Sequence, residues 1–222
     1  MSENTNTSAN DYIVPPCKEE VEILHADKLF LLVNKPSGLL SVPGKHPLNR
    51  DCLISRLQQT YPEARIVHRL DLDTSGIMVV ALNADSHRVL NKQFSERQTY
   101  KEYTAVVFGS VECDKGSIDL PLICDWPNRP KQMVDHERGK QALTHYEVLE
   151  RYSDRTRLRL KPVTGRSHQL RVHTMAIQHP ILGCDFYAHE TALKMAPRLL
   201  LHATELHIDH PATGERLSLI HI

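Results

Sequence analysis

The chain has 222 residues and carries 27 lysines and arginines against 27 aspartates and glutamates, so its formal net charge is zero. This balance excludes a strongly basic nucleic-acid-binding protein, and any surface for RNA must be local. The five scattered cysteines include no C-x-x-C pair, which argues against a disulfide framework and predicts reduced thiols in a cytoplasmic protein. The polar N-terminus lacks a signal-peptide pattern, and no apolar run is long enough to cross a bilayer, so we expect no membrane contact.

The first part of the chain predicts a tail followed by a hairpin. Residues 1–18 are rich in Ser, Asn, Thr and Pro, and we expect them to be disordered. Two apolar runs at residues 21–24 and 29–33 predict a β-hairpin, and the Pro-Ser-Gly that follows Lys35 predicts a turn. Apolar residues at helical spacing predict a helix over residues 50–61, which Pro62 ends.

The middle of the chain alternates between strand and helix patterns. Residues 65–67 predict a short strand, and the continuous apolar run 77–82 predicts a central buried strand. Asn83 is a suitable N-cap for a helix that runs to about residue 97. Residues 100–108 then predict another strand.

The last part of the chain predicts four more strands and one helix. Residues 155–160 alternate between arginine and apolar or threonine side chains, so one face of this strand should be basic and the other buried. Strands are also predicted at 144–149, 199–202 and 217–220, and a helix at 167–178. The irregular placement of three helices among short strands favours an α+β fold, with a mixed, mostly antiparallel sheet flanked by helices.

The segment His68-Arg69-Leu70-Asp71-Leu72-Asp73-Thr74-Ser75-Gly76 concentrates charge between two predicted strands. In an extended stretch, Arg69, Asp71 and Asp73 point to one side and the leucines to the other. These aspartates could simply bind backbone amides in a loop. A metal site formed by His68, Asp71 and Asp73 is a second alternative, and a catalytic turn is the third.

Two further segments are locally basic. Residues 155–173 carry six lysines and arginines and no acid, and could follow a phosphate backbone or form a solvated face balanced by acids such as Glu147 and Glu150. Residues 125–140 combine basic residues with Trp126, two prolines and a glycine, which predicts an exposed loop. Such a loop could contact RNA or be an ordinary surface loop. Motifs for nucleotide binding, serine hydrolases and zinc peptidases are absent from the sequence.

Several motifs, in order, resemble those of the RluA family of pseudouridine synthases. The segment around Asp71 resembles the family signature H-R-L-D-x-x-T-S-G, and residues 34–38 (NKPSG) and 101–103 (KEY) resemble its N-K-P-x-G and K-x-Y segments. Residues 165–173 (GRSHQLRVH), 179–184 and 199–203 continue the match, which covers residues 21 to 215. The resemblance implies a single catalytic domain over residues 19–222, without the S4-like RNA-binding domain of other members, and with an active-site cleft across the sheet.

The resemblance also implies roles for individual residues. Asp71 matches the catalytic aspartate of the family, Tyr103 its active-site tyrosine, and Arg171 the arginine that pairs with the aspartate. Arg69 matches the residue that fills the space left by a flipped base. We expect Asp71 to lie at the bottom of a basic cleft, in contact with Arg171 and Tyr103.

Further residues are candidate RNA contacts because they are basic or polar and lie in the matching segments. These are Lys35, Asn128, Arg129, Lys131, Arg166 and His168. The expected partners are a tRNA anticodon stem-loop and a 23S rRNA stem-loop, with no metal and no cofactor, and we expect a monomer. The alternatives are a relative that acts on only one class of RNA and a catalytically silent RNA-binding module. A metal-dependent hydrolase remains the third.

Overall fold

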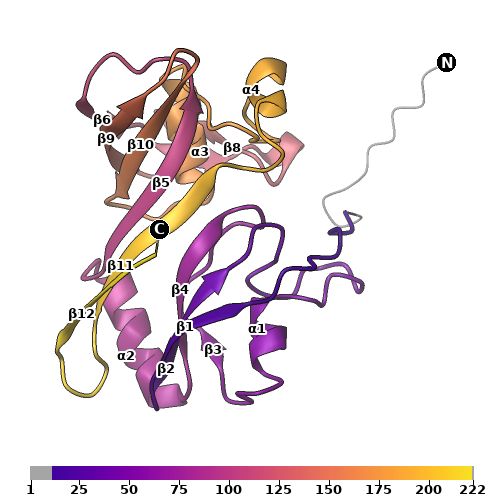
Figure 1. Ribbon diagram of the computed structural model, residues 1–222, viewed down its shortest axis with the longest axis vertical. Coiled ribbons are helices and arrows are strands. Elements are labelled where there is room, and N and C mark those ends of the chain that lie inside the picture. The colour runs from indigo at the N-terminus through magenta and orange to yellow at the C-terminus, as the bar shows by residue number, and fades with distance from the viewer. Residues whose placement is uncertain (1–11, 222) are drawn as a thin grey trace.

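The computed structural model describes residues 12–221, which form a ten-stranded sheet with helices packed around it and a separate two-stranded sheet of β7 and β8 (Figure 1). The strand order is β1-β2-β4-β11-β5-β10-β9-β6, with β3 paired to β4 and β12 to β11. All pairs are antiparallel except β4 with β11. The predicted α+β fold with a mixed, mostly antiparallel sheet is confirmed.

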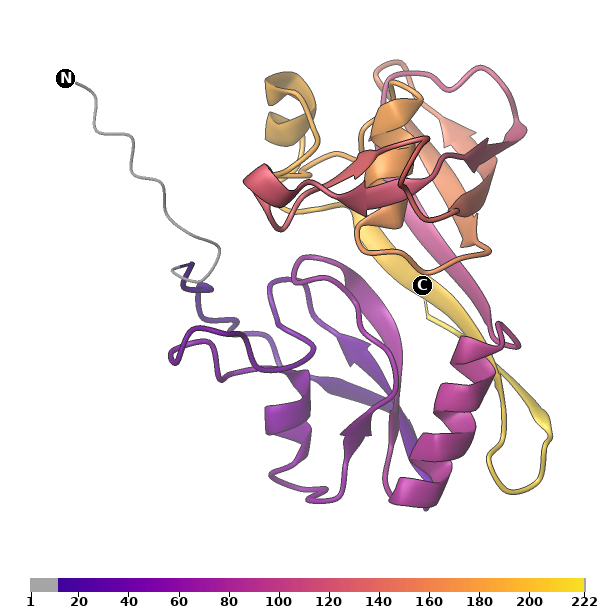
Figure 2. The same ribbon diagram turned by 180° about the vertical axis from the view of Figure 1, so that it is seen from behind.

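The N-terminal half of the sheet is covered on both faces, because α1 and α2 lie on opposite sides of it (Figure 2). Met78 and Val80 share a core with α1, whereas Val79 packs with Leu90 of α2. This explains the continuous apolar run of β4, all of whose residues are buried. The elements of this half are β1 (Glu22–Ala26), β2 (Phe30–Lys35), α1 (Leu53–Leu57), β3 (Arg65–Ile66), β4 (Ser75–Ala81) and α2 (Ala84–Ser95).

The C-terminal half is built on strands β5, β10, β9 and β6, with α3 against one face. Leu158 and Leu160 of β10 share a core with Leu170 and Val172 of α3. The opposite face is polar, which explains the alternating pattern of this strand. The elements are β5 (Tyr100–Phe108), β6 (Lys115–Asp119), β7 (Leu122–Cys124), the 3₁₀ helix η1 (Trp126–Asn128), β8 (Gln132–Val134), β9 (Leu143–Arg151), β10 (Arg155–Pro162), α3 (Gln169–Ala176) and α4 (Glu190–Lys194).

The two halves meet at β11 (Leu201–Asp209), which pairs with β4 on one side and β5 on the other, and with β12 (Arg216–Ile220) (Figure 1). At the parallel pairing, Gly76 lies opposite Ala203. Gly76 has a φ of +115°, and a Cβ added there would lie 2.3 Å from the carbonyl oxygen of Ala203. The close approach of the two strands therefore requires a glycine.

The predicted strands and helices are confirmed, with four differences. The strand expected at 199–202 begins only at Leu201 and continues to Asp209. The helix expected at 50–61 is limited to Leu53–Leu57, and the loop expected at 125–140 contains η1 and β8. Strands β6 and β7 and helix α4 were not predicted, because each is at most five residues long and carries little periodicity.

Residues 12–18, which the sequence predicts to be disordered, contain no helix or strand but contact side chains far along the chain. Asn49 accepts a hydrogen bond from the Val14 amide and donates one to the Tyr12 carbonyl, and Arg56 donates to the Cys17 carbonyl. Composition suggested disorder, but side chains far along the chain hold this segment. Residues 1–11 lie outside the described part. Within residues 12–221, no helix is long and apolar enough to cross a membrane.

Candidate active site

Asp71 lies in a turn between β3 and β4, and its side chain is 33% exposed. The turn is closed by a hydrogen bond from the Thr74 amide to the Asp71 carbonyl. The loop after β2 holds the turn from the side: the Gly38 amide donates to the Leu72 carbonyl at 2.9 Å, and Ser37 Oγ donates to the Asp73 carbonyl at 2.8 Å. The position of Asp71 is thus set by a second loop as well as by its own turn.

Lys35, at the end of β2, is the link between these two loops. Its ammonium donates to the carbonyls of Pro36, Leu39 and Leu72 at 2.7–3.0 Å, and the residue is 0% exposed. Burial lowers the pKa of Lys35 to about 8, against the opposing effect of nearby acidic groups including Asp71. The prediction that Lys35 contacts RNA is therefore wrong in this structure, because its three donors are all used on backbone carbonyls.

Arg171 of α3 reaches the same place from the other half of the sheet. Its side chain is 2% exposed, and its Nη1 lies 3.9 Å from Oδ2 of Asp71. Sequence positions a hundred residues apart are thus brought together as expected. The guanidinium is closer to a second acid, Asp185, whose Oδ1 lies 2.5 Å from Nη2.

Four consecutive residues after α3 surround Arg171, and no sequence pattern singled them out as a site. Besides the Asp185 contact, Arg171 Nε donates to the sulfur of Cys184 at 3.2 Å. Two aromatic rings flank the guanidinium, each at 5.2 Å from its central carbon: Phe186 and Tyr187. These contacts fix the orientation of a buried cation that would otherwise be costly to hold.

Tyr103 on β5 lies where the two halves of the sheet meet, because its ring packs against the cores of both. Burial and the nearby charge of Asp71 raise the pKa of its phenol well above the ordinary value. The hydroxyl therefore stays protonated at neutral pH, and the ring lies in the neighbourhood of the Asp71 carboxylate.

His168 lies next to Asp71, with its Nε2 at 4.0 Å from Oδ2 and its side chain 11% exposed. The residue precedes α3 and has a left-handed backbone, with φ of 52°. Burial and Arg171 lower the pKa of its imidazole, while the charges of Asp71 and Asp185 raise it. The structure thus places this predicted RNA contact inside the site, next to the carboxylate.

The remaining predicted RNA contacts lie on the surface. Arg69 is exposed, two residues before Asp71. Asn128 and Arg129 are exposed in the turn between β7 and β8, where the guanidinium of Arg129 lies 4.6 Å from the ring centre of Trp126. Lys131 is half-buried in the same turn, and Arg166 Nε donates to a backbone carbonyl. The turn is attached to the site because the Gln132 amide donates to the hydroxyl of Tyr187.

The charge around Asp71 differs from the basic cleft that the sequence suggested. Asp73 and Asp185 accompany Asp71, and burial followed by the charge of Asp185 raises the pKa of Asp73. The arginines of β10 do not contribute, because they alternate with Leu158 and Leu160 and so lie on the opposite face of the sheet. On that face Arg159 is neutralised by Glu102 and Glu147, at 2.7 and 2.9 Å.

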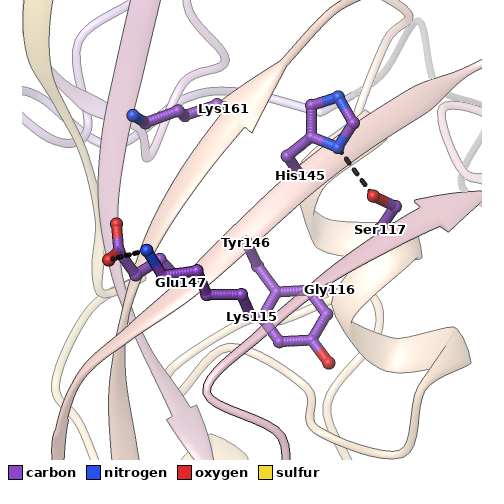
Figure 3. Close-up of a pocket in the computed structure, with 7 residues that line it drawn as sticks. All are labelled: Lys115, Gly116, Ser117, His145, Tyr146, Glu147 and Lys161. Atoms are coloured by element: carbon purple, nitrogen blue, oxygen red, sulfur yellow. Dashed lines mark hydrogen bonds and ion pairs between the residues drawn. The ribbon is translucent and has the colours of Figure 1, made fainter.

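A shallow hollow of about 400 Å³ lies on this opposite face, over β6, β9 and β10 (Figure 3). Lys115 contacts Glu147 there at 2.9 Å, and His145 lies 2.7 Å from Ser117 (Figure 3). Lys161, which also lines the hollow, lies 3.7 Å from Glu102. Most charged groups of the hollow are thus already paired.

The residues of the suggested metal site do not converge. His68 Nε2 accepts the Val79 amide at 3.1 Å, and its ring stacks on Phe94. Burial, followed by the charge of Lys101, lowers its pKa to about 3. Within residues 12–221, no three His, Cys, Asp or Glu side chains are arranged to hold a metal ion. His68 thus packs between β4 and α2, whereas Asp71 and Asp73 lie near Arg171 of the C-terminal half.

Comparison with known proteins agrees with this geometry. A family model described as RNA pseudouridylate synthase matches residues 29–176. The chain is 56% identical over 193 residues to the dual-specificity RNA pseudouridine synthase RluA of Yersinia pestis, covering 86% of this chain and 94% of the relative. It is 55% identical over 205 residues to the protein of the same name from Escherichia coli strain K12, covering 92% and 94%.

Two solved human structures have a similar fold. The chain is similar to human RNA pseudouridylate synthase domain containing 1, with a TM-score of 0.78 and 29% identity, covering 95% of this chain and 86% of that one. It is also similar to human RNA pseudouridylate synthase domain containing 4, with a TM-score of 0.73 and 27% identity, covering 90% and 88%.

Proposed function

The chain belongs to the RNA pseudouridylate synthase family, and from this premise we propose that Asp71 carries out the isomerisation of uridine to pseudouridine at the site described above. The observation that carries the proposal is the meeting of Asp71 and Arg171, which lie 3.9 Å apart although they come from different halves of the sheet. Tyr103, on β5 beside the junction strand β11, completes the group.

The reaction exchanges one bond of the sugar for another. The glycosidic bond from C1′ to N1 breaks, the base turns, a bond from C1′ to C5 forms, the proton on C5 leaves, and N1 takes up a proton. The product has the same atoms as the substrate, so no redox step and no cofactor is required. A single carboxylate is enough to act as a nucleophile or as a base at the sugar, and we assign this role to Asp71.

The two other side chains have supporting roles in this proposal. The charge and position of the Asp71 carboxylate are supported by Arg171, a cation that cannot lose its proton at physiological pH. The ring of Tyr103 offers a flat apolar face on which the uracil can stack while it turns. Because its phenol stays protonated, Tyr103 can donate a hydrogen bond to the uracil. It can accept the C5 proton only if it gives up its own phenolic proton.

We propose a tRNA anticodon stem-loop and a 23S rRNA stem-loop as substrates, because the relatives are named dual-specificity enzymes. A base in a folded stem-loop must leave its stack to reach Asp71, at a cost of roughly a few kcal/mol. Arg69 is suited to fill the vacated space, since it is exposed close to Asp71. The turn with Arg129 and Lys131 is suited to contact the RNA backbone.

We also propose that the protein works as a monomer in the cytoplasm. The five cysteines are free thiols in the described structure, which fits a reducing compartment.

The test treats an unmodified anticodon stem-loop and a 23S rRNA fragment with the protein and then maps pseudouridine chemically. We expect product in both RNAs. Asp71→Asn should abolish turnover and leave RNA affinity nearly unchanged, because it replaces one oxygen of the carboxylate and removes the charge. Asp73→Asn, in the same turn, is the matched control and should retain turnover.

The outcomes separate the alternatives. Product in only one RNA would indicate a synthase with a single class of substrate. Binding without product would indicate a silent RNA-binding module, and equal activity of wild type and Asp71→Asn would refute the assignment of Asp71.

A further inference from the structure

Tyr187 and His168 form a shielded contact beside the catalytic carboxylate. The hydroxyl oxygen of Tyr187 lies 2.6 Å from Nδ1 of His168, and it also accepts the backbone amide of Gln132 at 2.8 Å. Tyr187 is 8% exposed and the His168 side chain 11%. Water has little access to this contact, so the hydroxyl of Tyr187 and Nδ1 of His168 must satisfy each other's hydrogen-bonding capacity.

Counting hydrogens assigns the direction of this hydrogen bond. The Gln132 amide can only donate, so the Tyr187 oxygen accepts from it, and the one phenolic hydrogen must go elsewhere. In the described part of the chain, Nδ1 of His168 is the only acceptor within hydrogen-bonding distance of this hydroxyl. If Nδ1 carried the proton instead, the phenolic hydrogen would be left without a partner in a buried place, which is unfavourable.

The direction of this bond fixes the tautomer of His168. A neutral imidazole has one proton, and when Nδ1 accepts, the proton is on Nε2. The groups that face this ring are Asp71, Arg171, Asp185 and the rings of Phe186 and Tyr187. Of the two acids among these, Asp71 is the one that lies within 4.0 Å of Nε2.

We propose that His168 is a positioning residue that presents its Nε2–H to Oδ2 of the Asp71 carboxylate, and that Tyr187 sets this tautomer. The proposal rests on the proposed function of Asp71. The separation of 4.0 Å is longer than a direct hydrogen bond. Catalytic hydrogen bonds are often long in the free enzyme and tighten when substrate binds.

The geometry also distinguishes the two oxygens of Asp71. His168 Nε2 and Arg171 Nη1 both approach Oδ2, at 4.0 and 3.9 Å. If both separations shorten when substrate binds, the two donors share Oδ2 and restrict the orientation of the carboxylate. Oδ1 is then the oxygen presented to the sugar.

Tyr187→Phe is the first test, because it removes only the hydroxyl and keeps the ring beside Arg171. Nitrogen-15 NMR of the imidazoles reads the tautomer directly in the free protein. We expect the wild-type His168 to carry its proton on Nε2 and the variant to show a mixture. The control is His173, whose ring is held independently by Thr144 and the Leu120 carbonyl, so its signals should not move.

The second test is kinetic and uses release of tritium from RNA that contains 5-tritiated uridine. For Tyr187→Phe we expect kcat to fall roughly tenfold, as for the loss of one oriented hydrogen bond, with KM for the RNA unchanged. A rise in KM with unchanged kcat would instead make this region an RNA-contact surface and would overturn the proposal.

Two substitutions of His168 form a matched pair. The amide nitrogen of Gln can reach the position of Nε2, whereas that of Asn is closer to the position of Nδ1. His168→Gln should therefore keep a larger kcat than His168→Asn. Asn tolerates the left-handed backbone at this position better than Gln does, so a lower kcat in the Asn variant cannot be attributed to a weaker fold.

The outcomes test the role of His168, the role of Tyr187 and the proposed function separately. Equal kcat of the Gln and Asn variants would refute the positioning role, and a single unchanged tautomer in Tyr187→Phe would refute the role of Tyr187. Failure of the wild type to form pseudouridine would refute the proposed function itself. The NMR result does not depend on substrate, so the two failures are distinguishable.

Discussion

Replacing the buried Lys35 by methionine tests the placement of Asp71. Methionine has a similar length but no charge and no donor, so the carbonyls of Pro36, Leu39 and Leu72 lose their common partner. Each buried carbonyl without a donor costs about 1–3 kcal/mol. Against this, the drop in pKa from 10.5 to about 8 means that burying the charge costs roughly 3 kcal/mol, which methionine relieves.

Three such carbonyls together cost about 3–9 kcal/mol, so after the roughly 3 kcal/mol that methionine relieves, we expect the free energy of unfolding to fall by about 0–6 kcal/mol in Lys35→Met. Activity should fall as well. The Leu72 carbonyl directly follows Asp71 in the chain, and a displacement of about 1 Å at a reacting group can cost about a hundredfold in rate. We therefore expect kcat to fall about a hundredfold and KM for the RNA to stay nearly constant.

The assay measures kcat and KM on the anticodon stem-loop, and the dissociation constant at several salt concentrations. Lys131→Ala is the control, because this lysine lies in the surface turn between β7 and β8 and is only partly buried. It should weaken binding and reduce the salt dependence by about one ion, whereas Lys35→Met should leave the salt dependence unchanged. A Lys35→Met protein with normal kcat and a reduced salt dependence would show that Lys35 contacts phosphate, contrary to the structure.

Two further predictions concern stability. His68 is held neutral, with a pKa of about 3, so the unfolded chain binds the proton first as pH falls below 6.5. Between pH 7 and pH 5, the free energy of unfolding measured in urea should therefore fall by about 2 kcal/mol less in His68→Gln than in wild type. Glutamine can still accept the Val79 amide, so this hydrogen bond is kept. Gly76→Ala should lower the free energy of unfolding by about 3 kcal/mol or more, because its Cβ meets the Ala203 backbone. Gly214 also has a positive φ, of +71°, but open space around it, so Gly214→Ala should lower the free energy of unfolding by only about 1 kcal/mol, and equal losses for the two variants would exclude the clash.

The layers of the fold could be predicted from the sequence because burial on one or both faces of a strand determines how its apolar residues are spaced. The continuous apolar run of β4 reports a strand covered on both faces, and the alternation in β10 reports one covered face. Of the two interpretations of this basic stretch, the structure favours the solvated face balanced by acids for Arg159 of β10. Its arginines are basic in sequence, but Arg159 lies between Glu102 and Glu147, which come from other strands.

The position of single polar residues was harder to predict than the strands. Lys35 ends a strand and precedes a turn, where a lysine is normally exposed. The sequence carries no sign that three carbonyls converge on its ammonium, because one of them belongs to Leu72, far along the chain. The segment 184–187 was missed for a similar reason: its role depends on proximity to Arg171, which only the folded chain creates.

The assembly of the site from both halves of the sheet makes its geometry depend on their junction. Lys35 and Asp71 belong to the N-terminal half, and Arg171 to the C-terminal half. The turn with Asp71 leads directly into β4, whose Gly76 lies against β11, and β11 in turn pairs with β5, which carries Tyr103. Asp71 and Tyr103 are thus related through two strand pairings and one close approach of backbones. A shift between β4 and β11 would change the separation of Asp71 from both Tyr103 and Arg171, so the glycine at position 76 supports the site as well as the fold.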